Sequence, residues 1–160
     1  MGHSTRIWLP RWAGIIAMFT ALGAAADNAT PFPGTNVIKT RHSYAELVGK
    51  LPQAVAKHKM GVVAKASATV GAEKIGVTIP GNMVVMVFHP KYAVRMLEAS
   101  VPAGIEAPLR FYITENKDGT TTLTYRDPSS VFAPYENKDL DAMAKELDEI
   151  FARIAADATS

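Results

Sequence analysis

Residues 81–97 read GNMVVMVFHPKYAVRML, and residues 109–127 read LRFYITENKDGTTTLTYRD. The segment from Met83 to Phe88 is apolar and carries no charge, which is typical of a strand that is covered on both faces. Pro90 suits the first turn of a helix, because the backbone N–H that proline lacks would have no hydrogen-bond acceptor within the helix at that position. Two apolar runs flank Gly119 and predict a β-hairpin. We therefore expect a strand, a helix and a hairpin in the middle of the chain.

The register of this hairpin follows from the alternation of its apolar residues. A register shifted by one residue would place apolar side chains opposite polar ones, so it is rejected. The accepted register leaves residues 117–119 as a three-residue loop with its glycine last, which is a common hairpin connection. It predicts two apolar pairs, Ile113 with Leu123 and Phe111 with Tyr125.

The flanking segments predict two amphipathic helices and two more strands. Strands are expected at residues 37–42 and 62–69. Ser43 and Glu46 have the spacing of a capping box at the start of a helix that runs towards Lys59. In this helix Pro52 predicts a kink or a break, and Gly61 a stop. A last helix begins after Asn137, and its apolar stripe comprises Leu140, Met143, Leu147, Ile150 and Ile154. A sheet and two amphipathic helices predict an α+β fold, a two-layer α/β sandwich with both long helices on one face.

The N-terminal segment has the features of a secretory signal peptide. Arg6 and Arg11 precede the apolar stretch AGIIAMFTALGAAA, and no acidic residue occurs before Asp27. This stretch is shorter than the roughly 20 residues that a membrane span needs. We expect cleavage before Asp27 and a periplasmic or secreted product that does not associate with the membrane. The expected organisation is a signal peptide (1–26), a flexible leader (27–35), one domain (36–156) and a tail (157–160).

Composition excludes several classes of function. The chain has 17 basic and 15 acidic residues, and two of the basic ones lie in the predicted signal peptide, so the mature chain is formally neutral. A nucleic-acid partner is therefore not expected. The chain has no cysteine, which excludes thiol catalysis, cysteine zinc sites and covalent haem attachment.

Histidine is the first candidate for a ligand-binding residue. His42 and His58 are expected to be solvated, and no pair of histidines has the spacing of a preformed zinc site. His89 ends the apolar strand, on the same strand face as Met83. Its neutral imidazole could bind haem iron or another metal, or its ring could cap the following turn or face solvent. A second axial ligand for haem would be a methionine, water or the same histidine of a second subunit.

The hairpin supplies the second candidate group, on the face opposite the apolar one. In the derived register Arg110 lies opposite Arg126, and Tyr112 shares this face. Like charges on opposite strands are unfavourable unless an acid or an anion lies between them. Glu106 and Asp127 could supply that acid. Alternatively, the two arginines could clamp a ligand carboxylate, such as a haem propionate or an organic acid.

Four segments of the sequence resemble a known family. They are residues 81–97, the stretch AGIEAPLR at 103–110, the Asp118-Gly119 turn and YRDP at 125–128. Together they are similar to the domain of unknown function 302 family. The resemblance implies a compact α/β sandwich with an antiparallel sheet of four to six strands, like one half of the TATA-binding protein. It also implies a frequent homodimer and no settled activity.

Two functions remain open from the sequence. The first is an exported, non-catalytic module that holds a small hydrophobic or carboxylated ligand, with haem b as the sharpest candidate, in a pocket or at a dimer interface. The alternative is an envelope protein–protein interaction module without a small-molecule ligand. An enzyme would need an acid, two arginines and a histidine in one pocket: Glu106, Arg110, Arg126 and His89. The candidate ligand-binding residues are His89, Met83, Tyr112, Arg110 and Arg126.

Overall fold

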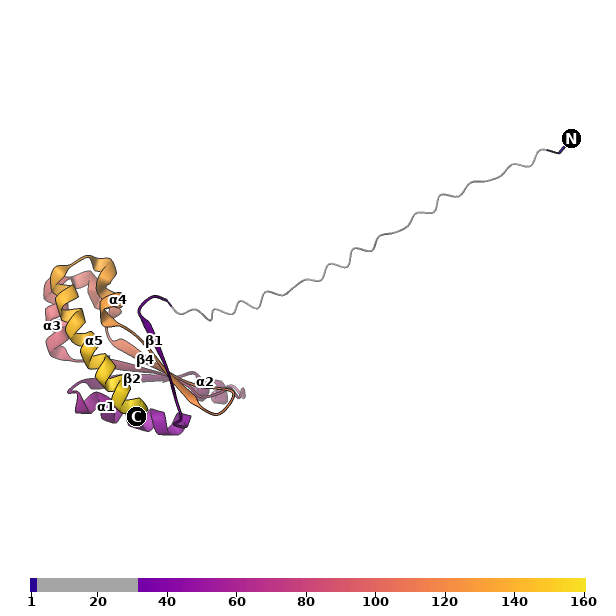
Figure 1. Ribbon diagram of the computed structural model, residues 1–160, viewed down its shortest axis with the longest axis horizontal. Coiled ribbons are helices and arrows are strands. Elements are labelled where there is room, and N and C mark those ends of the chain that lie inside the picture. Colours follow the sequence, from indigo (N-terminus) through magenta and orange to yellow (C-terminus); the bar gives the residue numbers. More distant parts are fainter. Residues whose placement is uncertain (3–31) are drawn as a thin grey trace. The chain divides into compact units, whose positions relative to one another are not determined.

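The computed structural model describes residues 1–2 and 32–160 (Figure 1). The predicted signal peptide and most of the predicted leader therefore lie outside the described residues, apart from the first two. No helix in the described part of the chain is both long and apolar enough to span a membrane. The elements, in order, are β1 (Thr35–Thr40), α1 (Tyr44–Lys57), β2 (Gly61–Ser67), α2 (Ala68–Lys74), β3 (Asn82–Phe88), α3 (Pro90–Ala99), η1 (Val101–Glu106), β4 (Leu109–Glu115), β5 (Thr121–Arg126), α4 (Pro128–Phe132), η2 (Ala133–Tyr135) and α5 (Lys138–Thr159).

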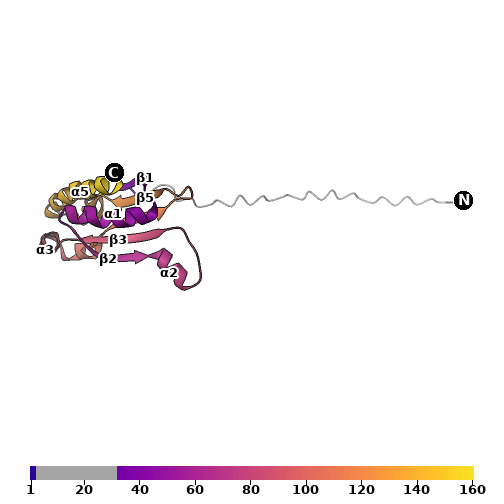
Figure 2. The same ribbon diagram turned by 90° about the horizontal axis from the view of Figure 1, so that it is seen from below.

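The five strands form one antiparallel sheet in the order β1-β5-β4-β3-β2. Figure 2 shows α1 and α5 on the same side of β2 and β3. The buried side chains of the sheet face these two helices, because alternate residues of a strand point to the same side. This arrangement confirms the predicted two-layer α+β sandwich. Its buried core includes Leu47, Leu51, Val85, Phe111, Ile113, Leu123, Leu147 and Phe151.

The hairpin has the predicted register. Phe111 pairs with Tyr125, and Ile113 pairs with Leu123. The amide of Asn116 donates to the carbonyl of Thr120 over 2.8 Å and closes the loop. Gly119 has a φ of 79°, which a glycine adopts without steric cost.

Helix α1 differs from the prediction at two points. The helix continues past Pro52 to Lys57, so the break considered at Pro52 is absent. Burial of the neighbouring Leu51 and Val55 against the sheet offsets the hydrogen bond that proline removes. The helix also ends before the predicted Gly61. Lys59 takes the left-handed conformation (φ 58°), and the buried Met60 then packs against the core.

The C-terminal end of the domain shows one further difference from the prediction. Helix α5 extends to Thr159, into the segment predicted to be a tail. Ala155 and Ala158 are buried, so the apolar face of α5 continues into this segment and holds it in the helix.

Strand β2 is an outer strand of the sheet. Its pairing with β3 is irregular between Val62 and Ala64, and the next residue, Lys65, is exposed. Most of β2 is exposed.

Candidate functional site

A pocket lies at the open end of the β4–β5 hairpin, where η1 enters β4 and β5 leads into α4; we call it the polar pocket because two arginines and a glutamate line it. Its volume is about 180 Å³. Residues from both hairpin strands, from η1 and from α4 line it: Glu106, Leu109, Arg110, Tyr112, Thr124, Tyr125, Arg126 and Val131.

The register of the hairpin brings two arginines to the wall of this pocket. Phe111 and Tyr125 form a pair on the core face, so the adjacent Arg110 and Arg126 both point to the opposite face. Both arginines are exposed. Within residues 32–160, neither guanidinium forms an ion pair with a carboxylate. Arg126 instead donates a long hydrogen bond of 3.4 Å to the carbonyl of Ser130.

The two acids considered as partners for these arginines bond elsewhere. Glu106 lines the same pocket, but its Oε1 accepts from the hydroxyl of Tyr135 at 3.1 Å. Burial raises the pKa of Tyr135, and the hydrogen bond to Glu106 raises it further. Asp127 accepts at 2.6 Å from the side-chain amide of Asn36 on β1. Neither carboxylate therefore neutralises an arginine directly.

Tyr112 contributes its ring to the polar pocket. Its side chain is 37% exposed on the face of the sheet that carries Arg110. The side-chain amide of Asn82, on β3, donates to the Tyr112 hydroxyl. The hydroxyl is the acceptor in this bond, so its own O–H group remains available to donate to a ligand.

A second, apolar pocket lies beside the first, between the end of β3, α3 and α5. Its volume is about 30 Å³. Leu109 lines both pockets, with its side chain on the core face of β4, whereas Arg110 points to the opposite face. The lining is almost entirely apolar: Met60, Val87, Phe88, His89, Tyr92, Ala93, Met96, Ala107, Leu109, Phe132, Met143 and Leu147.

His89 caps helix α3 at the rim of this apolar pocket. Its Nδ1 accepts from the amide of Lys91 at 3.1 Å, and its ring lies edge-on to that of Tyr92, with 5.8 Å between centroids. The capping role considered from the sequence is therefore present.

The pocket around His89 does not fit haem. A neutral imidazole that binds iron through Nε2 carries its proton on Nδ1, and a protonated Nδ1 could not accept from Lys91. The volume of about 30 Å³ is also far below the roughly 300–1,000 Å³ that cofactor sites provide. Within the described ranges, no group of three or more His, Cys, Asp or Glu side chains is placed to hold a metal ion.

The structure separates the candidate residues that the sequence grouped. Arg110, Tyr112 and Arg126 line the polar pocket together. His89 lines the apolar pocket instead. Met83 lies near the opposite end of β3, pairs with Ile113 and packs against the core.

The cluster that would favour an enzyme is incomplete. Glu106 shares the polar pocket with both arginines, but His89 is not among the residues that line it.

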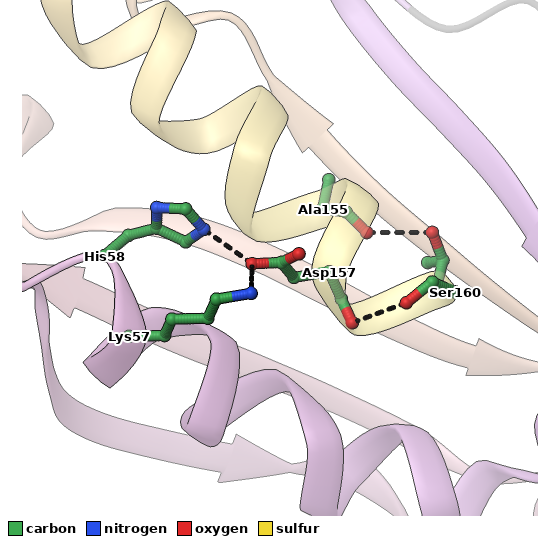
Figure 3. Close-up of polar contacts among 6 residues, drawn as sticks. Lys57, His58, Ala155, Asp157 and Ser160 are labelled. Carbon is green, nitrogen blue, oxygen red and sulfur yellow. Dashed lines mark hydrogen bonds and ion pairs between the residues drawn. The ribbon is translucent and has the colours of Figure 1, made fainter.

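His58 and His42 are less exposed than the sequence suggested. His58 follows the last residue of α1, and its Nε2 lies 2.7 Å from Oδ2 of Asp157 on α5 (Figure 3). Lys57 Nζ reaches the same oxygen at 2.8 Å. His42 Nε2 lies 2.9 Å from the carbonyl oxygen of Ser160. These contacts join the end of α1, and the turn before it, to α5.

The Asp157 contacts predict a change of stability with pH. The hydrogen bonds from Lys57 and then His58 lower the pKa of Asp157 below its usual value of 3.8. A lowered folded-state pKa stabilises the protein above the unfolded-state value, and this contribution is lost as pH falls through the folded-state value. We expect wild type to be more stable than Asp157→Asn at pH 5, with the difference shrinking towards pH 3. Urea unfolding across this range measures it, and a constant difference would contradict the role of the Asp157 charge.

One element of the site was not predicted from the sequence. Val131 reaches the polar pocket from α4, which begins at Pro128. Proline at the first helical position was the available signal, as it was at Pro90.

Comparison with known proteins gives a family and a fold. The family model described as Domain of unknown function DUF302 matches residues 36–158. No curated protein matches the chain. Among solved structures, the chain is similar to the crystal structure of an uncharacterized conserved protein DUF302 from Bacillus stearothermophilus, with a TM-score of 0.70 and 18% sequence identity. That match covers 80% of this chain and 99% of the other. The family match extends over most of the chain and over all five strands except the first residue of β1, so the chain belongs to the DUF302 family.

Proposed function

We propose that the protein is a non-catalytic binding module that holds a small carboxylate-bearing molecule between Arg110 and Arg126. The observation that carries the proposal is that both arginines line one pocket and that neither guanidinium has an ion-pair partner among residues 32–160. Two cations on facing strands repel each other, and a bound carboxylate would relieve this repulsion. Guanidinium also matches a carboxylate geometrically, through paired N–H donors.

The dimensions and the charge of the pocket limit the ligand. A volume of about 180 Å³ corresponds to about six water molecules, which suits a small organic acid. Two guanidinium groups and the Glu106 carboxylate give a formal charge of +1, which one ligand carboxylate would neutralise. Because both arginines are exposed, salt should screen the attraction and weaken binding.

The predicted signal peptide supports a location for this binding outside the cytoplasm. An exported module of this kind would meet its ligand in the periplasm or outside the cell.

Removal of either arginine provides the test. Arg110→Ala and Arg126→Ala are each expected to weaken the binding of butyrate by about tenfold or more, because a hydrogen bond to a charged group contributes about 1.5–3 kcal/mol. Isothermal titration calorimetry at low salt measures the dissociation constants. Arg153→Ala, on the solvent side of α5, is the matched control and should bind as wild type. Failure of wild type to bind any small carboxylate, or equal binding by all three variants, would overturn the proposal.

A second function is favoured by one different observation. Four large apolar side chains at intervals of three or four residues are exposed on α3 and η1: Val94 (55%), Leu97 (46%), Val101 (72%) and Ile105 (81%). Exposed apolar patches of this kind often mark protein–protein contacts. Contact with another protein, in its simplest form a homodimer, would cover them. Sedimentation of wild type as a dimer, and of Ile105→Asp as a monomer, would support this alternative.

A further inference from the structure

We infer that the ligand is an acidic amino acid, whose two carboxylates bind Arg110 and Arg126 and whose ammonium group binds Glu106. This inference rests on the proposed function, because it keeps the arginines as the carboxylate-binding groups and adds a role for the glutamate. All three residues line the polar pocket.

Glu106 is the residue of the polar pocket that a simple carboxylic acid leaves unmatched. Its Oε1 accepts from the hydroxyl of Tyr135 at 3.1 Å, and within residues 32–160 its Oε2 has no hydrogen-bond or ion-pair partner. The side chain is half-buried, so water screens its negative charge only in part. A ligand carboxylate in the same pocket is repelled by this charge. An ammonium group on the ligand offsets the repulsion and supplies N–H donors to Oε2.

The two arginines provide for a second carboxylate. The pairing of Phe111 with Tyr125 places Arg110 opposite Arg126 on the neighbouring strand, with about 5 Å between their β-carbons. Each guanidinium has paired N–H donors of its own, so each suits one carboxylate. The O–H group of Tyr112 adds a further donor to the pocket. An acid with two carboxylates a few carbon atoms apart therefore matches these donors better than a monocarboxylate does.

The charge pattern of the pocket points to the same class of ligand. Two arginines and one glutamate give the pocket two positive charges and one negative charge. The complementary molecule carries two negative charges and one positive charge, which is the pattern of aspartate and glutamate at neutral pH. Its net charge of −1 neutralises the formal charge of +1 in the pocket.

Four ligands with related carbon skeletons provide the experiment. L-glutamate has both carboxylates and the ammonium group, glutarate lacks the ammonium group, γ-aminobutyrate lacks one carboxylate, and butyrate lacks both groups. Isothermal titration calorimetry of wild type at neutral pH and low salt measures the four dissociation constants. We expect glutamate to bind about fivefold more tightly than glutarate, because it gains an ion pair with Glu106. It should bind about tenfold more tightly than γ-aminobutyrate, which loses the contact with one arginine.

Glu106→Gln provides the variant. The amide oxygen of glutamine can still accept from the hydroxyl of Tyr135, so the variant loses the charge and keeps the hydrogen bond. Without this negative charge in the pocket, glutarate is expected to bind at least as tightly as glutamate. Glu98→Gln, at an exposed position of α3 that does not line the polar pocket, is the matched control and should keep the preference for glutamate. If circular dichroism shows that Glu106→Gln does not fold, the comparison of glutamate with glutarate on wild type remains the test.

The outcomes separate the two proposals. If the acids bind and Arg110→Ala weakens them, but glutamate binds no more tightly than glutarate or γ-aminobutyrate, the carboxylate site stands and the inference about the amino acid is overturned. A preference for glutamate over glutarate that persists in Glu106→Gln also overturns that inference. If none of the four ligands binds to wild type, both proposals fail. A preference for glutamate that is lost in Glu106→Gln, with binding that is weakened in Arg110→Ala, supports both.

Discussion

Phe111→Ala is expected to lower the free energy of unfolding by about 3–5 kcal/mol, the usual cost of truncating a buried aromatic residue. Phe111 is fully buried at the centre of the sheet. Its ring stacks on that of Phe151 of α5, with 4.8 Å between centroids and 12° between planes. Alanine would remove this contact between the two layers and leave a cavity that the surrounding strands cannot fill. Urea unfolding monitored by circular dichroism measures the change.

Phe32→Ala is the matched control for this prediction. Phe32 is 79% exposed, so the same truncation should change stability by less than about 0.5 kcal/mol. Similar losses at the two positions would mean that the Phe111–Phe151 stack does not join the layers as described.

Gly81→Ala is expected to destabilise the protein by about 1–3 kcal/mol through overpacking. Gly81 is buried, and a β-carbon there would lie only 2.5 Å from Cγ of Tyr44. The Tyr44 ring belongs to the first turn of α1, so relief of the clash would displace the start of that helix from the sheet. Chemical denaturation of wild type and Gly81→Ala compares the two free energies.

A double-mutant cycle tests whether the clash with Tyr44 causes the loss of stability in Gly81→Ala. In a Tyr44→Ala background the clash is absent, so adding Gly81→Ala should cost much less than it does in wild type. Gly49→Ala, inside α1, introduces a β-carbon with no heavy atom within 4 Å and is the control. It should be neutral or stabilising by up to about 1 kcal/mol, because alanine is a better helix former than glycine. An equal cost of Gly81→Ala in both backgrounds would reject steric conflict with Tyr44.

The sequence predicted the fold well where the determining contacts are local. The hairpin register depends on side-chain alternation over residues 109–126, and the capping box at Ser43 depends on residues three apart. In the structure, Glu46 accepts from the Ser43 amide at 2.7 Å, and the Ser43 hydroxyl accepts from the Glu46 amide at 3.4 Å. Such patterns can be recognised without any knowledge of the tertiary structure.

The candidate site was predicted only in part, because it depends on how distant strands pair. The hairpin alone places Arg110 opposite Arg126. It does not reveal that Phe111 pairs with Val85 of β3, which puts Met83 on the core face, away from the arginines. The contact of His58 with Asp157, 99 residues later, likewise follows from the packing of α1 on α5 and leaves no local signal.

The irregular outer strand also limits how the molecule can assemble. Another chain adds to a sheet through an even row of free backbone N–H and C=O groups. In β2 that row is interrupted between Val62 and Ala64, and the Lys65 ammonium follows directly. An incoming strand would lose its alignment there and would have to desolvate a charge. Growth of the sheet into ribbons or fibres is therefore disfavoured along β2, so copies that associate there must do so through their side chains.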